Sequence, residues 1–98
     1  MDSGFEARIY ALVEKIPQGC VASYGQLALM AGYPHSARRA GRALSRAPKH
    51  LPCHRVVRSS GKTVPGWPEQ PVVLRSEGVV CRPGGTVDMR RCRWQPFR

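Results

Sequence analysis

The chain has 98 residues, and its 16 Lys and Arg residues outweigh its 6 Asp and Glu residues to give a net charge of +10. This length fits one domain, over residues 1–98, with a small core, and no apolar run is long enough to cross a membrane. Without a secretory signal we expect a cytoplasmic protein, nucleoid-associated if bacterial, and the charge favours nucleic acid as its partner over a basic surface that has none.

The first half of the chain predicts three helices joined by short turns. The first has an apolar stripe of helical spacing and ends before Pro17. Residues 21–24 are expected to be extended, and Ser23 is placed to cap the second helix. No acidic residue occurs between Glu14 and Glu69, so the third helix lies in a wholly basic stretch. The predicted helices span residues 5–16, 24–31 and 36–46.

The third predicted helix has two chemically different faces. One consists of small or apolar residues that allow close packing on the second helix, and the other is cationic. A helix, a glycine-containing turn and a cationic helix are typical of a DNA-binding helix-turn-helix, although a solvated basic helix is the plain alternative. The small face comprises Ala37, Ala40, Gly41 and Leu44, and the basic face comprises Arg38, Arg42 and Arg46, with Arg39 beside them.

The second half of the chain predicts shorter elements. Residues 52–57 enter the core through two valines, and a proline-rich loop follows over residues 63–71. The expected fold class is mainly α: a small winged helix-turn-helix domain with a short β-hairpin as the wing. The remaining predicted elements are a helix over 72–77, strands over 79–81 and 87–89, and a basic tail over 90–98.

The pentapeptide Pro52-Cys53-His54-Arg55-Val56 carries the most specific chemistry. It places a thiol beside an imidazole, and a thiol becomes a strong nucleophile when a nearby base takes its proton. Because the pair follows the basic helix-turn-helix, the reactive group is aimed at nucleic acid, whereas a small buried hydrophobe is the plain alternative for Cys53. The other cysteines lack the paired spacing of zinc sites and a setting that favours disulfides, so no metal is expected.

The sequence resembles the DNA-binding domain of the O6-alkylguanine-DNA alkyltransferases and of their short relatives, the alkyltransferase-like proteins. The Pro-Cys-His-Arg-Val pentapeptide is highly specific for this family, and the matching pieces follow the family's order over most of the chain, from Phe5 to Gly78. The matching pieces are residues 23–28, 37–44, 51–57, 60–61 and 74–78.

The resemblance implies a role for each of five side chains. Cys53 corresponds to the alkyl acceptor, His54 to the base that activates it through a bound water, and Glu77 to the carboxylate that orients the histidine. Tyr24 corresponds to the tyrosine that helps to turn out the target nucleotide and can protonate the departing guanine. Arg38 corresponds to the arginine that fills the gap in the base stack. Plain alternatives are a core position for Tyr24 and an Arg75 pair or helix cap for Glu77.

The resemblance also implies a DNA surface that enters the minor groove and a lesion pocket. The Val56 carbonyl is expected to read the amino edge of guanine, and two interpretations of Trp67 stay open, a lid over the turned-out base or an anchor for its loop. The expected DNA-binding residues are Tyr24, Ala37, Arg38, Arg39, Gly41, Arg42 and Ser60. The expected pocket residues are Tyr24, Pro52, Cys53, Val56 and Trp67.

Two functions from different classes remain. One is a single-turnover methylated-DNA–protein-cysteine methyltransferase, acting as a monomer without a cofactor on O6-alkylguanine in double-stranded DNA. The other is a non-catalytic sensor that flags the lesion for nucleotide excision repair proteins. Cys53 favours the first, because alkyltransferase-like proteins usually carry tryptophan or alanine there. The short chain and Ala47, where transferases usually have asparagine, favour the second.

Overall fold

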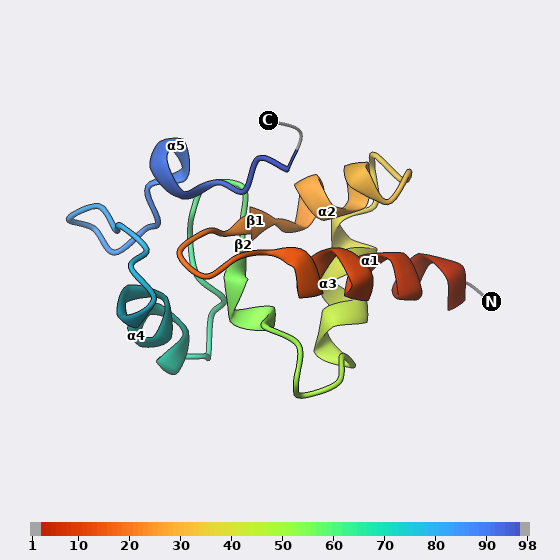
Figure 1. Ribbon diagram of the computed structural model, residues 1–98, viewed down its shortest axis with the longest axis horizontal. Coiled ribbons are helices and arrows are strands. Elements are labelled where there is room, and N and C mark those ends of the chain that lie inside the picture. The colour runs from red at the N-terminus through yellow and green to blue at the C-terminus, as the bar shows by residue number, and fades with distance from the viewer. Residues whose placement is uncertain (1–2, 97–98) are drawn as a thin grey trace.

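A computed structural model describes residues 3–96, and the ends of the predicted domain, residues 1–2 and 97–98, lie outside this range. In Figure 1 the helices of the first half of the chain gather at one end of the molecule, the short helices of the second half lie at the other, and a small sheet lies between them. Within residues 3–96, no helix is both long and apolar enough to span a membrane. The expected mainly helical fold is confirmed. The three gathered helices are α1 (Ser3–Lys15), α2 (Tyr24–Met30) and α3 (Ala37–Ser45).

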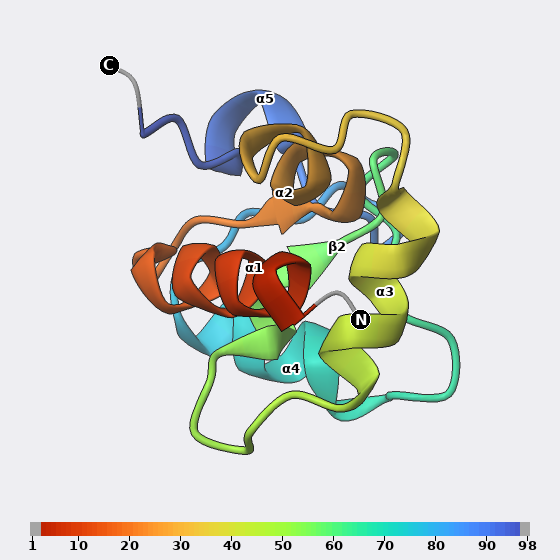
Figure 2. The same cartoon turned by 90° about the vertical axis from the view of Figure 1, so that its right-hand side faces the viewer.

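The apolar stripe of α1 forms the centre of the larger core. Its most buried side chains are at most 2 % exposed, and they pack against the inner faces of α2 and α3, which lie beside α1 in Figure 2. Ser23 caps α2 as predicted, because its hydroxyl accepts the Gln26 backbone N–H at 3.0 Å. Ala37 is exposed rather than part of the inner face, since packing begins one turn into α3, and Ala43 is buried instead. The buried members are Phe5, Ile9 and Val13 from α1, Ile16 directly after it, Leu27 and Ala28 from α2, and Ala40 and Ala43 from α3.

A parallel sheet joins the two halves of the chain. Strands β1 (Ala22–Ser23) and β2 (Val56–Val57) pair in the register Ala22 to Val56 and Ser23 to Val57. Residue Arg93 forms a further parallel bridge with Val21, and the Trp94 N–H donates to the Val21 carbonyl at 2.7 Å. The C-terminal segment therefore extends the sheet by one bridge, and Trp94 packs in the larger core.

The second half of the chain differs from its predicted elements in two places. Helix α4 (Glu69–Ser76) begins three residues earlier than expected, because Pro71 lies in its first turn, where a backbone N–H has no helical partner anyway. The predicted hairpin is present only as an antiparallel bridge between Cys81 and Val87. Beyond it, the Asp88 side chain accepts backbone N–H groups and starts a short helix, α5 (Met89–Cys92), which replaces the end of the second predicted strand.

Candidate functional site

A 3-10 turn, η1 (Cys53–Arg55), presents the Cys-His pair of the pentapeptide directly before β2, and we call it the reactive turn for the chemistry that the sequence predicts there. Cys53 N–H donates to the Leu51 carbonyl at 2.8 Å, and the Val56 N–H donates back to the Cys53 carbonyl. The valines of β2 that follow are fully buried, so they fix the turn to the core. This arrangement leaves the Cys53 side chain half-buried at the surface of the domain.

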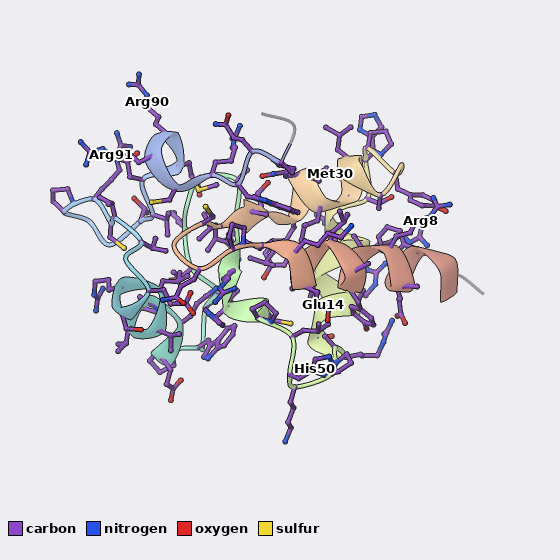
Figure 3. The ribbon with its side chains drawn as sticks, viewed as in Figure 1. Arg8, Glu14, Met30, His50, Arg90 and Arg91 are labelled. Carbon is purple, nitrogen blue, oxygen red and sulfur yellow. The ribbon has the colours of Figure 1, made fainter. Side chains whose placement is uncertain are left out.

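The thiol opens into a cavity of about 330 Å³ between α3, the connector that follows it and the loop before α4. The connector carries His50, which lies at the lower edge of the molecule in Figure 3. Of the predicted pocket residues, Cys53 and Trp67 line this cavity, whereas Tyr24, Pro52 and Val56 lie outside its lining. The lining consists of Leu44, Ala47, Pro48, Lys49, Leu51, Cys53, His54 and Trp67.

Glu77 joins the reactive turn to the end of α4. Its Oε2 lies 2.9 Å from His54 Nε2, and Arg55 holds the same carboxylate in a two-pronged contact, with Nε 3.0 Å from Oε1 and a terminal nitrogen 2.9 Å from Oε2. A second terminal nitrogen of Arg55 donates to the Ile16 carbonyl at 2.8 Å. Because a carboxylate only accepts, Nε2 carries the imidazole hydrogen, which leaves Nδ1 of His54 as the basic nitrogen.

The position of Glu77 would be unfavourable without these partners. It caps the C-terminal end of α4, where the helix dipole repels negative charge. The Arg55 hydrogen bonds outweigh burial and, together with His54, lower the pKa of the Glu77 carboxyl. Gly78, with φ of +91°, ends the helix in a left-handed turn directly after Glu77.

Two other groups of the site have raised pKa values. Burial raises the pKa of the Cys53 thiol, so the uncharged form dominates at neutral pH. Burial also raises the pKa of the Tyr24 hydroxyl, while the positive charge of Arg58 opposes that change. Both groups are therefore protonated at rest, and thiolate chemistry at Cys53 needs a base such as His54.

Gln70 is a central residue of the site that the sequence did not reveal. It is fully buried in α4, and its amide donates to the carbonyls of His54 and Val56, each at 3.0 Å. Its side-chain oxygen accepts the Val64 N–H at 2.7 Å, which fixes the loop that carries Trp67. The amide thus links both walls of the cavity to α4. A glutamine in a proline-rich stretch gives no sequence signal for such a role.

The arginines predicted on α3 divide into two groups. Arg39 lies over the Phe5 ring, 4.2 Å from its centroid, and Arg46 forms an ion pair with Glu6, so both face α1. Arg38 and Arg42 are exposed on the outer surface.

Tyr24 lies against the same helix. A Cβ atom added at Gly41 would lie 3.9 Å from the Tyr24 ring, which shows how closely the tyrosine approaches α3.

The chain is similar to proteins of one family over most of its length. The family profile described as 6-O-methylguanine DNA methyltransferase, DNA binding domain, matches residues 4–79. A DNA base-flipping protein of Escherichia coli (strain K12) is 39% identical over 98 residues, covering 95% of this chain and 76% of that protein. A methylated-DNA–protein-cysteine methyltransferase of Mycobacterium leprae is 40% identical over 62 residues, 61% of this chain and 38% of the other.

A solved structure with high similarity is S. pombe Atl1 in complex with damaged DNA containing O6-carboxymethylguanine. Its TM-score is 0.84 at 32% sequence identity, with 98% of each chain covered. The similarity therefore extends over the reactive turn, the sheet and the C-terminal segment.

Proposed function

This chain belongs to the family of 6-O-methylguanine DNA methyltransferase DNA-binding domains, and on that premise we propose that it binds O6-alkylguanine in duplex DNA, turns the damaged nucleotide out of the stack and transfers the alkyl group to Cys53. The observation that carries the proposal is the Cys53 thiol in an open cavity beside His54, whose imidazole Glu77 holds at 2.9 Å. An intact acceptor, base and orienting carboxylate are what direct reversal requires.

The reaction needs the base outside the helix, because O6 of guanine is unreachable in stacked duplex DNA. His54 takes the thiol proton at Nδ1 through a bound water, and Glu77 stabilises the imidazolium that forms. The thiolate then attacks the alkyl carbon, so a sulfur–carbon bond forms while the bond from that carbon to O6 breaks. Tyr24 supplies a proton to the departing guanine. The thioether product is stable, so each molecule reacts once and no cofactor takes part.

The exposed side of α3 is the proposed DNA surface. Arg38 fills the gap in the base stack, and Arg42 contacts phosphate. Ala37 is exposed on the same helix, where its small side chain permits close approach to the minor groove, and Gly41 brings Tyr24 against the helix. Ser60 is exposed on the turn after β2 and adds a contact with the DNA backbone. We assign Arg39 a supporting role, since its guanidinium lies over Phe5.

A lesion sensor that recruits nucleotide excision repair proteins is the second candidate. The observation that favours it is the raised pKa of Cys53, which holds the thiol in its unreactive form. The E. coli and S. pombe proteins similar over nearly the whole chain carry the names base-flipping protein and Atl1, and neither name is that of a methyltransferase.

The deciding experiment incubates the purified protein with a duplex that contains one O6-methylguanine and records the intact protein mass with peptide mapping. We expect a gain of one methylene on Cys53. Cys53→Ala should bind the lesion without gaining mass, while Cys81→Ala, a control at another half-buried cysteine, should react like the wild type. Uptake by Cys53→Ala would refute the acceptor assignment, and lesion-selective binding with no wild-type uptake would establish the sensor instead.

A further inference from the structure

Arg58 is a cation of the site that the roles assigned above do not use. The parallel register pairs Ala22 with Val56 and Ser23 with Val57, so Tyr24 and Arg58 are the next residues along the two strands. Both strands run in the same direction, and the two residues therefore leave the sheet at the same end, the carboxyl ends of the strands. Burial raises the pKa of the Tyr24 hydroxyl and the positive charge of Arg58 opposes that rise, which agrees with this placement.

The turn that carries Arg58 is held firmly against the rest of the domain. The Arg58 N–H donates to the Lys62 carbonyl at 3.0 Å, and the Gly61 N–H donates back to the Arg58 carbonyl at 2.8 Å. Gly61 has φ of +90°, and an added Cβ would lie 2.4 Å from the Val87 carbonyl oxygen. The Val87 N–H also donates to the Gly61 carbonyl at 2.9 Å. The backbone of Arg58 is thus fixed by the bridge segment of residues 81–87.

The Arg58 guanidinium is available for an external anion. It is exposed, and none of the acidic side chains within residues 3–96 forms an ion pair with it. Arg55, only three residues earlier, instead donates two guanidinium hydrogen bonds to the Glu77 carboxylate. An unpaired arginine fork suits a phosphate group, because two parallel N–H donors match two phosphate oxygens.

We propose that Arg58 binds the DNA phosphate beside the turned-out nucleotide and so stabilises the turned-out state over the stacked one; this inference rests on the proposed function. Arg38 and Arg42 are exposed on α3, the proposed groove-facing helix, whereas Arg58 leaves the sheet at the same end as Tyr24, which the proposed function places at the turned-out nucleotide. A phosphate at Arg58 therefore belongs to the nucleotide that enters the site. Arg58 is accordingly expected to discriminate damaged from undamaged DNA.

The test measures affinity for matched duplexes with and without O6-methylguanine. Arg58→Ala should weaken lesion binding about tenfold and undamaged binding only about twofold. The control Lys62→Ala removes an exposed charge from the same turn and should weaken both duplexes equally, about twofold. Arg58→Lys should be intermediate, since it keeps the charge and loses the fork. Equal losses in Arg58→Ala and Lys62→Ala would overturn the inference.

A thermodynamic cycle that combines Arg58→Ala with a neutralised phosphate identifies which phosphate Arg58 binds. Each of the two phosphates that flank the lesion is replaced in turn by an uncharged methylphosphonate. With one of these two duplexes, Arg58→Ala should lower lesion affinity almost no further, because the phosphate charge that Arg58 binds has already been removed. Additive losses at both positions would overturn the inference while wild-type lesion preference stands. A wild-type protein that shows no lesion preference would overturn the proposed function, and this inference with it.

Discussion

The reactive turn and helix α3 use arginine in opposite ways. Arg55 is 17 % exposed and holds a carboxylate that is 13 % exposed, together with a backbone carbonyl of the segment after α1. Arg38 and Arg42 are exposed on α3, and no acidic side chain within residues 3–96 forms an ion pair with them. The first arginine organises the protein, and the other two are left for a partner. Net charge alone does not distinguish these uses, since all three count equally toward +10.

Arg55→Ala should give the largest effect and lies on the organising side of the comparison. It leaves the largely buried Glu77 carboxylate without its arginine partner and removes the donor to the Ile16 carbonyl, so we expect a loss of about 3 kcal/mol in the free energy of unfolding. Urea unfolding measures this loss. Arg42→Ala is the matched control and should stay within about 0.5 kcal/mol. Comparable losses in the two variants would erase the distinction between the two regions.

The pH dependence of stability sharpens the same distinction. The folded-state pKa of Glu77 is lowered, so its stabilisation is fully present above the unfolded value of about 4.3 and is lost as pH falls through the folded value. Wild-type stability should therefore decline below about pH 5, and Glu77→Gln should decline less steeply over that range. Thermal unfolding from pH 3 to 7 measures both curves. Identical curves would mean that the ion pair contributes nothing to folding.

Gln70→Ala should have the next largest effect. It leaves the carbonyls of His54 and Val56 and the N–H of Val64 without their partner, and we expect a loss of about 2 kcal/mol. The loop that carries Trp67 should also exchange amide hydrogens faster, which separates this role from a general loss of packing. Gln70→Glu preserves the side-chain volume as a comparison. Unchanged exchange in residues 63–67 would show that the amide does not fix the loop.

Local patterns in the sequence predicted the helices well and the sheet poorly. The stripe of α1 and the Ser23 cap depend on residues three or four positions apart, so periodicity and capping reveal them. Strands β1 and β2 have two residues each and pair across 34 positions, too short for any alternating pattern to appear. The early start of α4 was missed because Pro71 normally marks the end of a helix and here occupies its first turn.

The candidate site also contains residues that the sequence predicted and residues that it did not. The pentapeptide predicted Cys53 and His54 as site residues because they are adjacent, and the family resemblance added Glu77, whose Oε2 lies 2.9 Å from His54 Nε2. No pattern indicated that Arg55 would bind Glu77, 22 residues away, or that Arg39 would turn to Phe5. Side-chain partners between distant elements follow from packing, which neither charge nor periodicity records.

Arg38→Ala tests the partner-binding side of the comparison. It should weaken lesion binding about tenfold and undamaged binding less, because the gap in the base stack exists only when a nucleotide is turned out. Arg39→Ala is the control in the same helix turn and should lower stability more than lesion preference, since it loses the contact with Phe5. Fluorescence anisotropy with both duplexes and thermal unfolding separate these effects. The opposite pattern would exchange the roles assigned to the two arginines.

Gly41→Ala should have the smallest effect on stability, and it should change stability and lesion affinity in opposite directions. The added methyl group would lie 3.9 Å from the Tyr24 ring, an ordinary contact, and alanine is favoured over glycine within a helix by about 0.5–1 kcal/mol. Stability should therefore rise slightly. Lesion affinity should nevertheless fall severalfold, because the methyl group restricts Tyr24 at the surface proposed to meet the minor groove. Gly25→Ala, whose methyl group would meet only the Ser23 hydroxyl at 4.0 Å, should leave lesion affinity unchanged. A gain in stability with no loss of binding would mean that Gly41 serves helix packing alone, and that the DNA surface of α3 is confined to its exposed arginines.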